Sequence, residues 1–404
     1  MSRGSASVAK SKKPYLYEVD LMRIIFIFGV LLNHTTTAFE GRIANSSGSQ
    51  LFLEATHLSL HFTRMGFMFM TGLVLVLNHY NRNGRWGQFW RKRYGSVGIP
   101  YLGWNAILLA GTLAVTTGFS WQKFTPQYWD AVIHGNQFYM YYILVTFELY
   151  LLFPLIVWLF KKFPEGHGQI MIVSITAQMM LLIAIKYGLP NVDRSHWWYL
   201  FRAYGMNVLV YQVYFLAGAF TAIHYKAVDA FIHKHARFIG WFTGVLAIGT
   251  VGLFFFDQKV LHLSMAATES VHQPYLLVYD LMMITFVFWV DRGYAYWREH
   301  GMWGWLDRLI HAGAKVSFGI YLDQTLALAL LRVILAHIQL PSWGFVLLLP
   351  FGYLFVIGTA FAIAWGCYKI PPFGALIGRP QWHPFKKGVR QHDQIIRKAQ
   401  STTR

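Results

Sequence analysis

Two ionisable side chains lie within the first long apolar stretch of the chain, residues 20–39. Arg23 stands near its start and His34 follows eleven residues later. Ionisable side chains at membrane depth are costly and normally face a protein interior or a water-filled cavity. Eleven residues are close to three helical turns, so the two side chains share one helix face about 16 Å apart. This spacing places a fixed cation toward one membrane surface and a potential general base toward the other.

The same two residues also have simpler interpretations. Arg23 is close to the expected membrane boundary, where a long cationic side chain can extend to the headgroups. His34 can be a buried histidine that hydrogen-bonds a neighbouring helix. The spacing alone leaves these alternatives open.

A second polar group precedes the next apolar stretch. Glu54, His57, His61 and Arg64 follow one another at offsets of three, four and three residues, which is one stripe of a helix. They fall at the same predicted depth as His34, so we expect a polar, substrate-binding vestibule there. Three histidines can indicate a metal, but the ligand spacing of a zinc-protease helix is absent. We therefore expect no metal, and simple solvation at the membrane interface remains an alternative.

Further charges accompany these two groups. Glu148 lies in the middle of the fourth apolar stretch, and intramembrane carboxylates mark a pathway or pair with a buried cation. We expect Glu148, or alternatively Glu54, to orient the His34 imidazole. Asp280 and Asp323 lie in later stretches, where structural ion pairs are at least as good an explanation.

Arg91, Lys92 and Arg93 belong to a basic loop, residues 81–98, that precedes the third apolar stretch. On the same side as Arg23, such a cluster suits a phosphorylated ligand. Ordinary loop charge beside a membrane is the alternative.

The composition predicts the class of fold. Of the 404 residues, 55% are hydrophobic and 13% are charged, against about 25% charged in soluble domains. We predict an all-α, polytopic membrane helix bundle of about ten transmembrane helices. Cys367 is the single cysteine, so an internal disulfide is excluded. The predicted spans are residues 20–39, 60–78, 96–115, 139–160, 170–185, 206–223, 238–256, 275–290, 316–335 and 344–367.

The basic residues predict the orientation of these spans. The net charge of +18 would suit a nucleic-acid partner, but its distribution indicates membrane topology instead. With the N-terminus inside, 26 of the 35 Lys and Arg fall on the inner side, 6 on the outer side and 3 within spans. The positive-inside rule therefore predicts that both termini are cytoplasmic. We expect a cytoplasmic tail at 1–19, one membrane domain at 20–370 and a basic cytoplasmic tail at 371–404.

Five stretches, in order, carry a resemblance to a known family. Asp20-Leu-Met-Arg23 followed after ten residues by His34 resembles the Arg-x10-His signature of the integral-membrane acyltransferase-3 family. Four further stretches resemble its second, third, fourth and late spans: Phe67-Met-Phe-Met-Thr-Gly72, Phe89-Trp-Arg-Lys-Arg93 with Ile99-Pro100-Tyr101, Tyr141 to Pro154, and Ser317-Phe-Gly-Ile-Tyr321. The resemblance extends from about residue 14 to 370.

The resemblance implies a membrane O-acyltransferase that moves an acyl group, here expected to be acetyl, from cytoplasmic acyl-CoA to a hydroxyl of a cell-surface glycan or related sugar. Its functional positions fall on Arg23, His34 and Arg93. The second arginine of the family's Arg-x-x-Arg is replaced by Ser96, for which Arg91 and Lys92 are possible substitutes. The family's late Ile-His-Pro is replaced by Asp323-Gln-Thr. No fused extracytoplasmic domain is expected, and the cell membrane is the expected location.

The expected donor is acetyl-CoA, with no tightly bound cofactor, and the expected partners are the sugar acceptor and the bilayer. His34 would act as general base or as covalent acyl carrier. A transporter or flippase for a glycan or lipid-linked sugar is the main alternative. It predicts internal repeats, of which the sequence has no convincing example. A structural partner in a glycan-synthesis complex is the second alternative.

Overall fold

The computed structural model describes residues 16–82, 84–190 and 192–380, and within these ranges all regular structure is helical. Nine helical segments of the described residues are long and apolar enough to cross a membrane. They are α1 (Glu18–Glu40), α2 (Gly48–His57) with η1 (Leu58–Leu60) and α3 (Phe62–His79), α4 (Trp86–Thr116), α6 (Tyr141–Lys162), α7 (His167–Ile183) with η2 (Ala184–Gly188), α10 (Tyr225–Lys259), α12 (Pro274–Glu299), α13 (Gly304–Ala336) and α14 (Ser342–Lys369).

Shorter helices connect or supplement these segments. They are α5 (Trp121–His134), α8 (Tyr199–Arg202), η3 (Tyr204–Met206), η4 (Val208–Val210), α9 (Gln212–Ile223), α11 (Met265–Thr268) and η5 (Phe373–Ile377). The prediction of an all-α membrane bundle is therefore confirmed.

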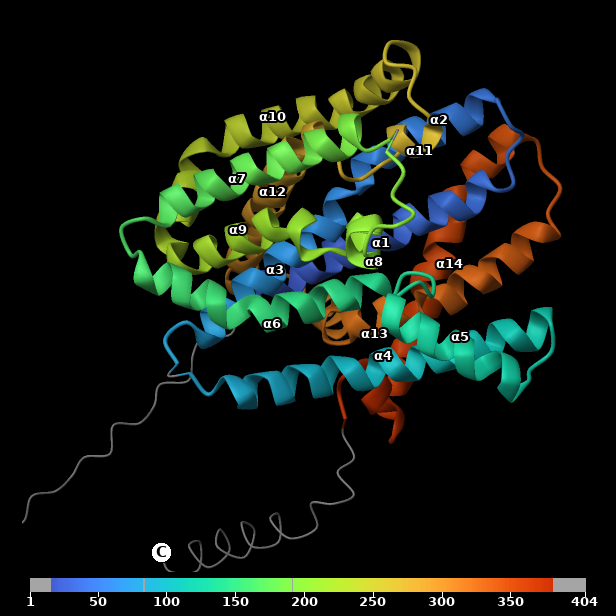
Figure 1. The fold of residues 1–404 in the computed structure, drawn as a ribbon, viewed down its shortest axis with the longest axis horizontal. Coiled ribbons are helices and arrows are strands. Elements are labelled where there is room, and N and C mark those ends of the chain that lie inside the picture. Colours follow the sequence, from blue (N-terminus) through green and yellow to red (C-terminus); the bar gives the residue numbers. More distant parts are fainter. Residues whose placement is uncertain (1–15, 83, 191, 381–404) are drawn as a thin grey trace, which may run out of the picture.

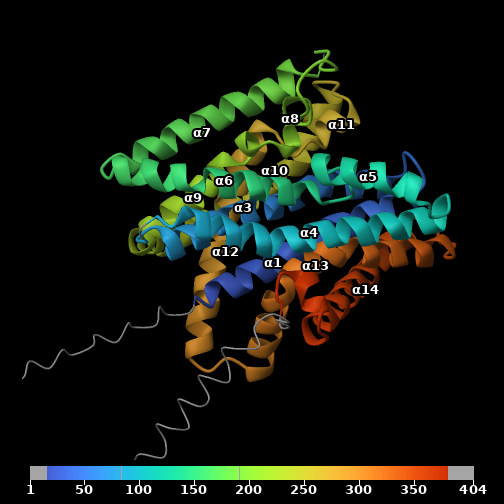
Figure 2. The same ribbon diagram turned by 60° about the horizontal axis from the view of Figure 1, so that its bottom comes forward.

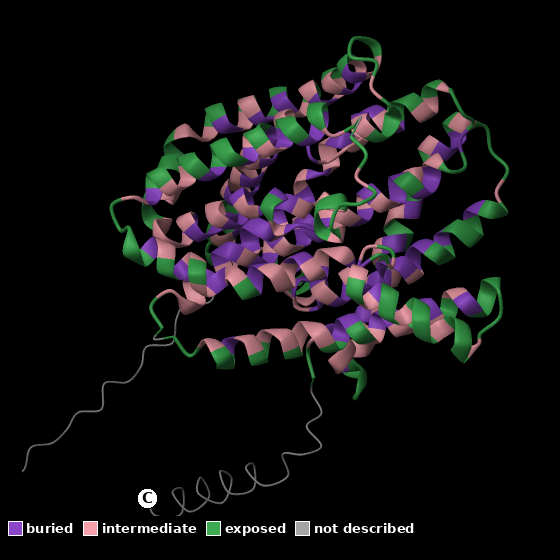
Figure 3. Cartoon of the chain, viewed as in Figure 1, coloured by how far each residue is buried: buried purple, intermediate pink, exposed green. Residues whose placement is uncertain are grey.

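The α1 helix runs through the middle of the bundle, and α7 and α14 lie on opposite sides of it (Figures 1 and 2). It packs against α3, α12, α13 and α14. Phe26, Ile27, Leu31 and Phe39 on α1 are completely buried. Buried residues concentrate on these central helices, whereas α7 and α5 are largely exposed (Figure 3). The polar residues of α1 are thus held in protein rather than in lipid.

The sixth predicted span, residues 206–223, is not one continuous helix. Helix α9 begins only at Gln212, and its 12 residues rise about 18 Å, well short of a hydrocarbon core of about 30 Å. The preceding residues form the short turns η3 and η4, separated by Asn207 in an extended conformation. Glu148 Oε2 accepts a hydrogen bond of 2.7 Å from Val208 N, so the interrupted backbone gains a partner. Irregular backbone at membrane depth requires such compensation.

Helix α9 packs very closely on α3 through two glycines. A Cβ added at Gly72 would lie 2.1 Å from Phe215 O, and one added at Gly218 would lie 1.9 Å from Phe69 O. Small residues at helix contacts in membranes allow such approach of two backbones. The pair fixes α9 beside α3 although the segment that precedes it is irregular.

The last described residues fold back against the helix bundle. Residues 371–380, assigned above to a tail, include η5, and Trp104 Nε1 donates a 3.0 Å hydrogen bond to Leu376 O. Gly378 has a φ of +67°, and a Cβ there would lie 2.6 Å from Ser96 O. This glycine therefore permits the segment to close against α4. Residues 1–15 and 381–404 of the predicted tails lie outside the described residues.

Candidate active site

A single cavity of about 310 Å³ is lined by both Arg23 and His34. The two residues lie on the same face of α1, about 16 Å apart along its axis. The cavity therefore continues along three turns of this helix. Both residues therefore border the same cavity inside the protein.

One part of the lining, which we call the basic end, carries four cations: Arg23, Arg93, Lys315 and Arg379. Ile24, beside Arg23, is the nearest neighbour of a Cβ at Gly313, and Ser96, near Arg93, is the nearest neighbour of one at Gly378. These contacts bring α1, α4, α13 and the segment after η5 together. The cations therefore converge from four separate parts of the sequence.

Three of the cations have defined contacts within the protein, and the Lys315 ammonium lies 5.4 Å from the centre of the Tyr368 ring. Arg23 Nη1 donates to Asp20 Oδ1 over 3.4 Å, and the other Asp20 oxygen is 3.0 Å from His311 Nδ1. Asp20 is 2% exposed, so it is a fixed anchor for Arg23. The Arg93 guanidinium lies 5.9 Å from the centre of the Phe89 ring. Charged and planar, the two guanidinium groups suit the phosphates of a ligand.

The opposite part of the lining, which we call the histidine end, contains His34, His61 and Arg64. The His34 ring stacks on Tyr139 with ring centres 3.6 Å apart and 22° between the planes. Tyr139 is held in turn, because the Tyr321 hydroxyl donates to its carbonyl oxygen. The imidazole therefore has a fixed orientation at the wall of the cavity.

Arg64 is surrounded by aromatic residues. Its guanidinium lies 5.4 Å from the centre of the Tyr141 ring and donates a hydrogen bond to the Tyr211 hydroxyl. No carboxylate of the described residues forms an ion pair with it. A buried cation with no carboxylate in direct contact, at the end of a cavity, is suited to an anion or to developing negative charge.

The remaining predicted site residues lie outside the lining of this cavity. Arg91 and Lys92 are exposed on α4. Glu148 bonds the backbone of residue 208, as described above, and the structure gives it this partner rather than His34. Glu54 accepts a 2.7 Å hydrogen bond from Gln50. The His57 ring packs against the His61 ring, with ring centres 5.1 Å apart. Within the described residues, no group of His, Cys, Asp or Glu side chains is arranged to hold a metal.

Several residues of the lining carry no clear signal in the sequence. In the sequence, Lys315 and Arg379 stand out only as inner-side charge, but in the structure they add cations to the cavity in which this chain has Ser96 where the family pattern has arginine. In the sequence, Tyr139 is only the first residue of the predicted span 139–160. Its sequence, Tyr139-Met-Tyr-Tyr, is an aromatic cluster at the boundary of a predicted span, which was the available signal.

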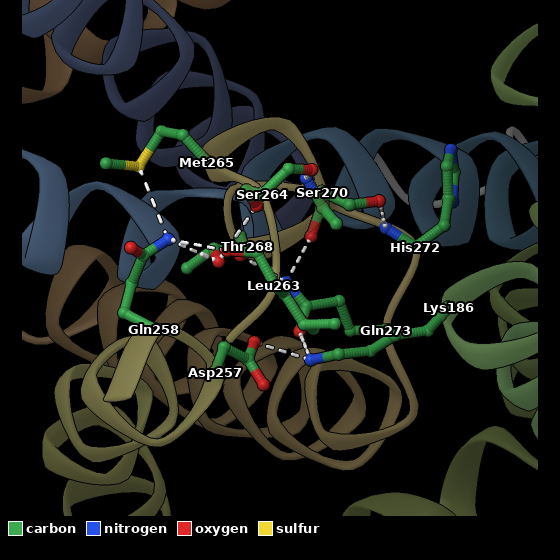
Figure 4. A network of polar contacts seen from close by, with 11 residues as sticks. Lys186, Asp257, Gln258, Leu263, Ser264, Met265, Thr268, Ser270, His272 and Gln273 are labelled. Atoms are coloured by element: carbon green, nitrogen blue, oxygen red, sulfur yellow. Dashed lines mark hydrogen bonds and ion pairs between the residues drawn. The ribbon is translucent and has the colours of Figure 1, made fainter. Parts of the chain in front are cut away.

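A buried ion pair stabilises the part of the structure next to the histidine end. Lys186 Nζ is 2.6 Å from Asp257 Oδ2, and the two side chains are 1% and 0% exposed. Figure 4 shows Lys186 extending toward both Asp257 and Gln273, with the segment from Leu263 to His272 folded around them. Gln273 donates 2.6 Å hydrogen bonds to the Thr268 and Ser270 carbonyls. Burial, with a smaller contribution from Arg64, lowers the pKa of His272 in this segment to about 3.

These features define a polytopic membrane protein in which one cavity connects a cluster of cations to a cluster of imidazoles. The sequence profile of the acyltransferase-3 family, described as an acyltransferase domain, matches residues 16–365. The chain therefore belongs to this family and is a membrane O-acyltransferase. No curated protein and no solved structure matches the chain significantly.

Proposed function

We propose that the protein transfers an acetyl group from cytoplasmic acetyl-CoA to a hydroxyl of a cell-surface glycan or related sugar, as a multi-pass protein of the cell membrane. The observation that carries this proposal is the single cavity lined by both Arg23 and His34. Transfer across a membrane requires the donor's anionic part and its reactive group to occupy different depths. The cavity offers a cationic site and a base at two such depths.

The basic end is the proposed site of the donor phosphates. This end carries four positive charges, more than one phosphate group needs, and so suits the several phosphates of CoA. The charges belong to Arg23, Arg93, Lys315 and Arg379. Lys315 and Arg379 take the place of the second arginine that the family pattern would put at Ser96. The pantetheine arm then follows α1 and brings the thioester toward His34.

The histidine end is the proposed site of reaction. His34 accepts the proton of the acceptor hydroxyl as that oxygen attacks the thioester carbonyl. Stacking on Tyr139 restricts the ring to one plane, which is the kind of positioning that general-base catalysis requires. A covalent acyl-His34 intermediate is the alternative course for the same residues.

The test uses purified protein in lipid nanodiscs, with release of the CoA thiol as the readout. We expect thiol release from acetyl-CoA that increases when a sugar acceptor is added, and its loss in His34→Ala and Arg23→Ala. Arg91→Ala is the matched control, because Arg91 is exposed outside the cavity. Normal transfer by a correctly inserted His34→Ala or Arg23→Ala protein would remove that residue from its role. Sugar movement without any thiol release would indicate a transporter instead.

Mass spectrometry of surface glycans from cells with and without the protein identifies the acceptor. We expect loss of a 42-dalton increment, the mass of one added acetyl group, from one class of glycan. Glycans identical in the two cultures would contradict the proposed acceptor class.

A further inference from the structure

His61 is a buried side chain with an unused ring nitrogen. It is 7% exposed, it lines the cavity, and its Nε2 has no hydrogen-bond partner among the described residues. Buried polar atoms in native proteins are nearly always paired, so an unpaired one at a cavity points to a ligand. The other ring nitrogen of His61 is engaged within the protein.

Asn33 determines where the proton of His61 lies. The Asn33 amide nitrogen, Nδ2, is 3.1 Å from His57 Nε2 and 3.5 Å from His61 Nδ1. An amide nitrogen only donates hydrogen bonds, so both ring nitrogens accept. His61 is therefore neutral at Nδ1 and carries its hydrogen on Nε2.

His57 and Glu40 continue this arrangement away from the cavity. Because His57 Nε2 accepts from Asn33, the His57 hydrogen resides on Nδ1, which is 3.7 Å from Glu40 Oε1. This contact is longer than a hydrogen bond but places the Glu40 carboxyl group on the protonated side of the ring. The contacts from Glu40 through His57 and Asn33 to His61 thus leave the His61 Nε2–H as the free donor group within the described residues.

We propose that His61 Nε2–H and the Arg64 guanidinium stabilise the oxyanion that forms on the acyl carbonyl during transfer. This inference rests on the proposed acyl transfer. Arg64 follows His61 by three residues, so both side chains lie on the same helix face and both line the cavity. A neutral donor beside a cation stabilises charge that develops in the transition state.

The roles of the groups are then distinct. The acceptor oxygen forms a bond to the carbonyl carbon while His34 takes its proton. The carbonyl oxygen becomes negative and is held by His61 and Arg64. The carbon–sulfur bond then breaks, the carbonyl is restored, and the CoA thiolate receives the proton from His34. His61 donates a hydrogen bond throughout and gains or loses no proton.

Two substitutions at position 61 distinguish a donor from a base. The Gln amide nitrogen reaches the place of imidazole Nε2 and donates, whereas the shorter Asn amide ends near the place of Nδ1. We expect His61→Gln to retain kcat within about tenfold, and His61→Asn to lose about 10²–10³-fold with little change in KM. His79→Gln and His79→Asn are the matched controls. His79 lies at the far end of α3, outside the cavity lining, and its Nδ1 contacts Leu75 O. Both control variants should have wild-type kcat.

A spectroscopic measurement tests Asn33 as the positioning residue, independently of activity. Nitrogen-15 spectra of histidine-labelled protein, with His61 assigned from its variants, should show hydrogen on Nε2 only. Asn33→Leu should shift part of His61 to the other tautomer and lower kcat without raising the KM for acetyl-CoA.

Three results would overturn the inference. Equal loss in His61→Gln and His61→Asn would mean that His61 is a base or a structural residue. Full activity in His61→Asn would mean that the N–H is not used, and a wild-type spectrum with hydrogen on Nδ1 would refute the tautomer. In each of these cases the wild-type protein still transfers acetyl. A wild-type protein that never releases thiol refutes the proposed function, and the inference with it.

Discussion

Loss of Lys186 should strongly destabilise the protein. Its ammonium is 2.6 Å from the Asp257 carboxylate, and both side chains are almost fully buried. Lys186→Met leaves a buried carboxylate without its cation, a change that costs about 3–5 kcal/mol. The Lys186→Met, Asp257→Leu double variant removes both charges. It leaves only the Gln273 amide oxygen without its donor, at about 1–3 kcal/mol.

The assay is equilibrium unfolding in mixed micelles with increasing fractions of denaturing detergent. Lys259→Met is the matched control, since Lys259 is exposed on the same helix as Asp257, and its effect should stay within about 0.5 kcal/mol. The double variant should be more stable than the Lys186→Met single variant. A single variant that loses less than about 1 kcal/mol, or a double variant that loses as much as the single one, would refute the reasoning.

Three further predictions concern separate parts of the structure. Lys315→Gln and Arg379→Gln should each raise the KM for acetyl-CoA about tenfold or more with kcat nearly unchanged, because each removes a charge-assisted bond to phosphate; unchanged KM in both would exclude them from the donor site. Gly72→Ala should destabilise by about 1–3 kcal/mol or more, because its Cβ meets a backbone oxygen, while Gly244→Ala enters open space and should not. Burial and the Glu54 charge raise the pKa of Glu269, so its ionisation costs stability as the pH rises through its ordinary value. Glu269→Gln should therefore stabilise the protein at pH 7 relative to wild type and have little effect at pH 4; an equal effect at both would contradict this.

The sequence predicts the class of fold because membrane spans are long apolar segments, and nine of the ten predicted segments lie in long helices of the described chain. It predicts the relation of Arg23 to His34 because helical geometry alone fixes side chains eleven residues apart. The orientation of the termini stays a prediction. Arg23 and Arg379 do line the same basic end, so both ends of the described chain approach one side of the bundle.

The break before α9 could not be predicted from hydropathy. Residues 206–211 are as apolar as a helix requires, and the extended conformation at Asn207 depends on a carboxylate 59 residues earlier in the chain, Glu148. The sequence predicts that a mid-span carboxylate has a polar partner, but in the structure the partner of Glu148 is a backbone N–H rather than the His34 ring. Only the packed structure identifies which polar group a buried carboxylate satisfies.

The sequence also could not predict which residues line the cavity. Lys315 and Arg379 lie in segments where positive charge is expected for topology alone, so their residue type carries no further signal. Their place beside Arg93 follows from the return of η5 against α4, which Gly378 permits. Likewise, the approach of Asn33 to two histidines of the next helical segment depends on how α1 packs on α3.

The most direct test of the central claim is a structure of the protein bound to a hydrolysis-resistant acetyl-CoA analogue in which a thioether replaces the thioester. The account predicts the phosphates among Arg23, Arg93, Lys315 and Arg379, with the arm along α1 and the acetyl-bearing end beside His34. An analogue bound with its phosphates away from these cations, or with its acetyl-bearing end remote from His34, would contradict it.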